Sequence, residues 1–163
     1  MSARTFLSHH VLEVSNVPID STGAGRTGDY YSLKDFQGIV FWIQQGAWAG
    51  GTPAVTLKQA TAVAGTGAKA LGFSEKYSKV GLTGTVNVLG AVTSDTFNLT
   101  VAANRMELIE VSAADLDRAN GYDCVGLDIA TPGANADLVT VLAILYGPRY
   151  AGDPAILPDP KVD

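Results

Sequence analysis

The sequence contains one cysteine and two histidines among 163 residues, and this scarcity excludes several kinds of site. A single thiol, Cys124, cannot form an intramolecular disulfide or a cluster of thiolate metal ligands. His9 and His10 are neighbours on a predicted strand, where successive side chains point to opposite faces, so they cannot hold one metal ion together. A Ser-His-Asp site would need one of these two, and the G-x-S-x-G motif is missing. We therefore expect no enzyme activity, no bound metal and no cofactor.

Positive charge is also scarce. Eleven Lys and Arg stand against sixteen Asp and Glu, for a net charge of -5, and the basic residues are scattered singly. Nucleic-acid binding depends on grouped cations that displace counterions from phosphates, so we expect no direct nucleic-acid partner. The charged fraction of 17% is low beside 47% hydrophobic residues, which indicates that another subunit covers part of the surface.

The sequence lacks an apolar run of the eighteen or so residues that cross a bilayer. The stretch MSARTFLSHHVLEV also lacks the apolar segment and cleavage site of a secretory signal. We expect a soluble protein with no membrane partner.

Glycine is plentiful, and two glycine-rich stretches resemble phosphate-binding loops. In VAGTGAKAL, Ala68 separates Gly67 from Lys69, and no hydroxyl residue follows the lysine. We interpret this stretch as a hairpin connection in which Gly65 and Gly67 take positive φ angles and Lys69 is solvated. The stretch GAGRTG (23–28) matches G-x-G-x-x-G, but it has no hydrophobic strand before it and no amphipathic helix after it, which indicates a loop.

Apolar residues recur at every second position, the pattern of strands with one buried face. This predicts an all-β fold, an antiparallel β-sandwich that is jelly-roll-like and has extended N- and C-terminal arms. One helical turn is expected at 112–117, capped by Ser112. The predicted strands are Val11–Val17, Gly38–Gln45, 55–58, Lys69–Tyr77, Thr85–Val92, 96–101, Arg105–Val111, 124–129 and Leu138–Tyr146.

The organisation follows from these strands. Residues 1–8 form an N-terminal arm, residues 9–151 the β-sandwich domain and residues 152–163 a C-terminal arm. Three prolines favour an extended path for the last segment, which cannot serve as an inner strand. It carries the adjacent aliphatic residues Ile156 and Leu157, which we expect to dock on a neighbouring molecule. A disordered tail is the alternative.

Two predicted strands are apolar on both faces. In GIVFWIQQ, Trp42 lies on the face opposite Phe41, and the segment LVTVLAILY has apolar residues in both registers. Either a loop covers the second face or it is a subunit interface. The interface hypothesis has four candidate residues, which are Trp42, Leu142, Ile144 and Tyr146.

Three segments carry a resemblance to a known family: TLKQATAVAGTGAKAL (56–71), RMELIEVSAADLDRANGYDCVGLDIA (105–130) and ADLVTVLAILYGPRYA (136–151). They resemble the capsid decoration, or cement, proteins of tailed bacteriophages, over about residues 40–151. The resemblance transfers no catalytic residue. It implies a β-rich structural virion protein that binds the outer surface of the icosahedral capsid as an oligomer and stabilises it.

The partners that this resemblance implies are the major capsid protein and other copies of the chain, in a homodimer or a homotrimer. The implied location is the capsid exterior, after synthesis in the host cytoplasm. Ile156 and Leu157 would then dock on the capsid or on a neighbouring subunit. The alternative is a β-sandwich module of the virion that binds carbohydrate or a host receptor, with Trp42, Trp48, Tyr30 and Tyr31 as aromatic platforms.

Overall fold

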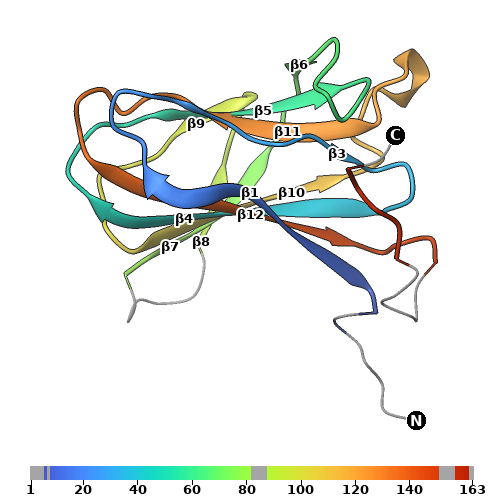
Figure 1. Ribbon diagram of the computed structural model, residues 1–163, viewed down its shortest axis with the longest axis horizontal. Coiled ribbons are helices and arrows are strands. Elements are labelled where there is room, and N and C mark those ends of the chain that lie inside the picture. Colours follow the sequence, from blue (N-terminus) through green and yellow to red (C-terminus); the bar gives the residue numbers. More distant parts are fainter. Residues whose placement is uncertain (1–5, 7, 82–87, 151–156, 162–163) are drawn as a thin grey trace.

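The computed structural model describes residues 6, 8–81, 88–150 and 157–161, and it shows two antiparallel β-sheets packed face to face (Figure 1). The one helical element in the described chain is a short 3₁₀ turn, η1 (Arg118–Asn120). The prediction of an all-β sandwich is confirmed.

Sheet A has six strands in the order β1-β12-β4-β10-β7-β8. Their bounds are β1 His10–Asp20, β12 Asp137–Tyr146, β4 Gly38–Trp48, β10 Arg105–Ser112, β7 Glu75–Val80 and β8 Val88–Ala91. The pair β4 and β12 runs through the middle of the sheet, from Gly38 opposite Tyr146 to Trp48 opposite Asp137.

Sheet B has the order β2-β11-β5-β6, with β3 also paired to β11 and β9 to β5. Its strands are β2 Arg26–Thr27, β3 Tyr31–Ser32, β11 Cys124–Ile129, β5 Ala54–Ala60, β6 Lys69–Ala70 and β9 Thr96–Asn98. The stretch 23–28, which matches the dinucleotide motif in letters, leads into β2 and pairs with β11.

The strand order is that of a jelly roll. The first and last strands, β1 and β12, are neighbours in sheet A. The strands β1, β12, β4 and β10 lie side by side in that order and face β2/β3, β11, β5 and β9 of sheet B. The hairpin β7–β8 is inserted between β6 and β9 and extends sheet A beyond β10. The predicted topology is therefore present with one added hairpin.

Alternation along the strands places the core between the two sheets. On β4, Ile39, Phe41 and Ile43 are fully buried, while Val40 and Trp42 on the opposite face are partly exposed. The same alternation on β12, β10, β5 and β11 adds further buried side chains, which are Val139, Val141, Ala143, Leu145, Ile109, Val111, Val55, Leu57, Val125, Leu127 and Ile129.

Three predicted elements differ from the structure. The strand expected at 69–77 is two strands, because the chain leaves sheet B after Ala70, buries Leu71 and enters sheet A at Glu75. The strand expected at 96–101 ends at Asn98, and Val101 is exposed. Of the strand expected at 85–92, residues 88–91 form β8, and residues 85–87 lie outside the described chain.

The predicted helical turn at 112–117 is a non-helical turn, and the 3₁₀ turn follows it at 118–120. Ser112 still makes a cap-like contact, since its Oγ accepts a hydrogen bond from Ala114 N while its own N donates to Asp115 Oδ2. Local polar bonds therefore form as expected without a helix to cap.

The GTGAK segment lies in the connection between β5 and β6, as predicted. Gly65 and Gly67 have φ angles of 76° and 63°. A Cβ on Gly65 would lie 3.0 Å from the ring of Tyr30, so the turn also covers that ring. The side chain of Lys69 is 41% exposed, and its Nζ also pairs with Asp117 Oδ2 and lies 3.9 Å from the centroid of the Tyr122 ring.

Replacing either glycine should destabilise the domain. Gly65→Ala and Gly67→Ala each force an L residue into positive φ, which costs about 1 kcal/mol. We expect the Gly65 substitution to cost more, since only its Cβ meets Tyr30 closely. Urea unfolding of both variants measures the difference; equal losses would show that contact with Tyr30 adds nothing.

Candidate functional site: the outer face of sheet A

The four residues predicted for an interface lie on one surface, the side of sheet A that faces away from sheet B. In the ladder between β12 and β4, Leu142 is opposite Trp42, Ile144 opposite Val40, and Tyr146 opposite Gly38. Directly opposed residues of an antiparallel pair point to the same side of the sheet. Trp42, Leu142, Ile144 and Tyr146 therefore share this surface, which we call the outer face.

The outer face continues across the neighbouring strands as apolar rows. One row runs Val14, Leu142, Trp42, Leu108 and Tyr77, from β1 through β12, β4 and β10 to β7. A second row runs from Leu12 on β1 through Ile144 and Val40 and ends at Glu110 on β10.

Sequence reasoning missed the contributions of β1, β10 and β7. Leu12 and Val14 are 52% and 49% exposed, and Tyr77 is 41% exposed. The signal was present in the segment RMELIEV, where Met106 and Leu108 occupy the register opposite Ile109. That strand too is apolar on both faces.

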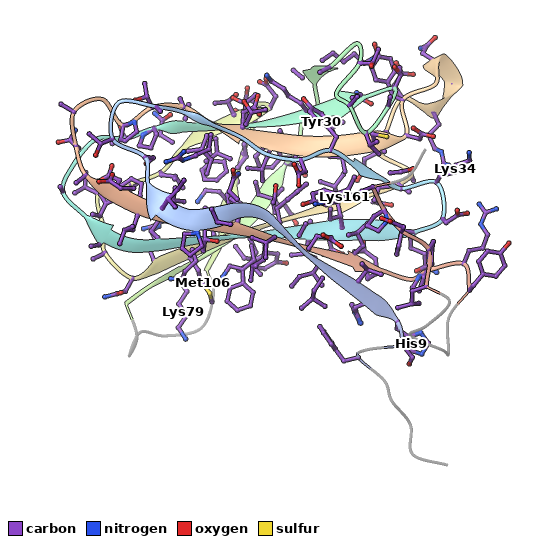
Figure 2. The ribbon with its side chains drawn as sticks, viewed as in Figure 1. His9, Tyr30, Lys34, Lys79, Met106 and Lys161 are labelled. Carbon is purple, nitrogen blue, oxygen red and sulfur yellow. The ribbon has the colours of Figure 1, made fainter. Side chains whose placement is uncertain are left out.

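Trp42, Leu142, Ile144 and Tyr146 are partly exposed, so the described chain does not cover them completely. At the β1 edge of the face, Leu12 shares a groove with Leu157 and Pro158. Figure 2 shows Met106 and Lys79 pointing away from sheet B on this side. Lys79 is opposite Met106 in the ladder, and neither residue belongs to the two apolar rows. The apolar rows are open to a partner.

Tyr146 joins the outer face to the edge of β10. A Cβ on Gly38 would lie 2.3 Å from the Tyr146 hydroxyl, so the tyrosine ring passes over Gly38, where only glycine leaves room. Burial, a hydrogen bond to the Glu110 carboxylate and the charges of Glu110 and Asp115 raise the pKa of Tyr146 to about 12. The phenol is therefore neutral at physiological pH.

The aromatic platforms considered for carbohydrate binding are mostly unavailable. Tyr31 is fully buried in the core, and Tyr30 is buried against Gly126 and Gly65. Trp48 is partly buried against the core, and its Nε1 donates to Gly51 O. A sugar platform must face solvent, and among the four only Trp42 is a partly exposed side chain that does not pack against the core.

The thiol and the histidines have structural surroundings. Cys124 is fully buried in a small cluster with Tyr30 and Ala60. His10 stacks on Phe6, with ring centroids 4.4 Å apart. In the described residues, no group of three or more His, Cys, Asp or Glu is arranged to hold a metal ion.

Leu157 lies beside β1 of its own chain, in a groove that His10–Glu13 line together with residues 157–160. Ser32 N donates to Pro160 O at 2.8 Å, and Lys161 Nζ lies 2.7 Å from Asp29 Oδ2. Residues 157–161 are thus docked on their own subunit. Ile156 lies outside the described residues, and docking of the arm on a neighbour or a capsid remains a prediction.

Comparison with known proteins gives little beyond this geometry. No protein family and no curated protein matches the sequence. Among solved structures, the SPBc2 prophage-derived protein YomS is similar to this chain with a TM-score of 0.46 and 12% identity, over 85% of this chain and 93% of that one. No helix among the described residues has the length and apolarity to cross a membrane.

Removing residues 157–163 should lower the free energy of unfolding by about 1–3 kcal/mol, because a backbone hydrogen bond, the buried Pro160 and two ion pairs are lost. Lys161→Ala, which removes only the partly exposed ion pairs, should cost less than about 1 kcal/mol. Thermal and urea unfolding report both values. A truncated chain as stable as the full chain would show that these contacts contribute nothing.

Tyr146 should also affect alkaline stability. Its folded pKa of about 12 lies above the ordinary value of 10, so its contribution to stability is complete below pH 10 and is lost as pH rises toward 12. Tyrosinate absorbance should show that Tyr146→Phe removes one of the residues titrating near pH 12, where buried Tyr31 also titrates. Loss of a group titrating near pH 10 instead would contradict the placement of the phenol.

Proposed function

We propose that this chain is a structural protein of a tailed-phage virion that attaches to the capsid exterior and stabilises the shell as an oligomer, without catalytic activity. The phage assignment derives from the sequence resemblance of residues 40–151 to decoration proteins. The observation that carries the attachment role is the outer face of sheet A, where the four candidate residues lie together and are partly exposed.

The composition of the outer face favours a protein partner. Its central row contains Trp42, Leu142 and Leu108 and no charged residue, which is the composition of the centre of a stable protein interface. Aromatic residues in such centres contribute most of the binding energy. A sheet face of this kind left in water would favour association.

We assign the outer face to contact between copies of the chain, in a homodimer or a homotrimer. A self-complementary patch needs no second surface, because closed symmetry repeats the same residues on each subunit. The major capsid protein is then held by the assembled oligomer. Synthesis in the host cytoplasm precedes this assembly on the virion.

Substitution in the central row tests the oligomer. Trp42→Glu and Leu142→Asp should convert an oligomer into monomers, because each buries an unpaired charge at the interface. Light scattering coupled to size-exclusion chromatography measures the mass at micromolar concentration. The control is Thr27→Glu, which adds the same charge at an exposed position of sheet B and should leave the mass unchanged.

Two results would contradict the proposal. A wild-type protein that is monomeric at micromolar concentration would remove the self-association. An oligomer that survives both charged substitutions would place the interface elsewhere. Mixing the same variants with undecorated capsids then separates self-association from capsid binding, since monomers that still decorate the capsid at full occupancy would show that the oligomer is not needed.

A further inference from the structure

Sheet A is split between β10 and β7. The two strands pair from Arg105 opposite Val80 to Leu108 opposite Tyr77, and the pairing stops there. Beyond that point β10 continues to Ser112, while Glu75 pairs with Ala91 on β8 instead. The opening holds a cleft of about 760 Å³, a volume typical of ligand sites.

One wall of the cleft is a free strand edge. Ala113 N donates to Gln37 O, on the side of β10 that faces β4. Since strand residues alternate between their two neighbours, Val111 also faces β4, and the N–H and C=O of Glu110 face the cleft. In the described chain, Glu110 has no backbone partner on that side.

The cleft has an apolar floor and an acidic rim. The floor is formed by the buried side chains of Leu57, Leu71 and Val111. The carboxylates at the rim belong to Glu75, Glu110 and Asp115, and no Lys, Arg or His lines the cleft. None of the three carboxylates forms an ion pair within the described residues.

We propose that this cleft binds an extended, basic segment of a partner polypeptide, which adds to the free edge of β10 at Glu110. The cleft adjoins the outer face, since Tyr77 and Tyr146 line the cleft and also lie on that face. The proposal does not depend on the virion role, and the cleft variants below leave the row of Trp42, Leu142 and Leu108 unchanged, so failure of one proposal is distinguishable from failure of the other. It rests on three features together: the unpaired backbone, the apolar floor and the uncompensated negative charge.

Each feature selects part of the ligand. Backbone groups at an exposed edge bind an extended strand through main-chain hydrogen bonds. Alternate side chains of that strand then point toward the apolar floor and toward the rim, so the ligand should alternate an aliphatic residue with lysine or arginine. The acidic rim disfavours nucleic acid and acidic peptides, since like charges repel.

Gly72 provides a way to close the cleft without straining the backbone. It lines the cleft, its φ is outside the positive range, and a Cβ built on it meets no atom within 4 Å. Gly72→Trp should therefore fill the space while leaving the fold intact. Glu75→Gln combined with Asp115→Asn removes two rim charges and keeps the shape.

The test is a titration of the full chain with a short capped peptide that alternates lysine and valine, followed by amide NMR. We expect the Glu110 amide resonance to shift when this peptide binds. A control peptide that alternates glutamate and valine should produce no shift. Gly72→Trp and the double rim variant should each weaken binding at least about tenfold, a loss of about 1.4 kcal/mol. The control Asp128→Asn removes one charge from the outer side of sheet B and should bind as wild type.

Thermal unfolding first establishes that each variant is folded. If Gly72→Trp proves unfolded, the double rim variant decides the question, because its substitutions are nearly isosteric. Equal affinity for the basic and acidic peptides would overturn the proposal. So would unchanged binding by a folded Gly72→Trp, or equal weakening in Asp128→Asn, which would indicate only general attraction to an acidic protein.

Discussion

One constraint underlies the rest of the structure: β4 and β12 are apolar on both faces, but sheet B covers only one of these faces. The inward residues of the pair, such as Phe41 and Val141, are fully buried between the sheets. Their outward neighbours, such as Trp42 and Leu142, are only partly buried by the described chain. Within the described residues, burial of the core therefore leaves a second apolar surface partly in contact with water, which favours association with another molecule.

The two sheets have different outer surfaces. Sheet B covers its own outer side, where Tyr30 lies against Gly126 and the Gly65 turn closes over the ring. Beyond this cluster, Lys58 Nζ and Asp128 Oδ2 form a partly exposed ion pair, 2.6 Å apart. Sheet A has no comparable cover in the described residues. This asymmetry supports the proposal that the outer face of sheet A, and not that of sheet B, is the attachment face.

Alternation in the sequence predicted the central strands well, because each is long and its buried register is strictly apolar. The same reasoning identified the four interface candidates, since the sequences of β4 and β12 have apolar residues in both alternating registers. The break after Ala70 was not predictable, because Lys69–Tyr77 alternates throughout and only the arrangement of the two sheets makes the chain cross at Leu71. Exposure of Lys69 agrees with the sequence, but its ion pair was not predictable, since its partner Asp117 is 48 residues away.

The cleft was beyond the reach of sequence analysis. It exists because β7 leaves β10 at Tyr77, a feature of register that no local pattern records. The burial of Cys124 likewise depends on how residues 29–30 fold over Gly126. Features that depend on contacts between segments distant in the sequence could be identified only from the structure.

The measurement that tests the central claim most directly is hydroxyl-radical footprinting of the outer face before and after assembly. Oxidation of Trp42 and Met106 should fall several-fold when the protein is concentrated into its oligomer or bound to capsids, while Tyr122, beside Lys69 at sheet B, should react as before. Equal oxidation of Trp42 and Met106 in dilute, concentrated and capsid-bound protein would show that the outer face remains in water, and the account would be wrong.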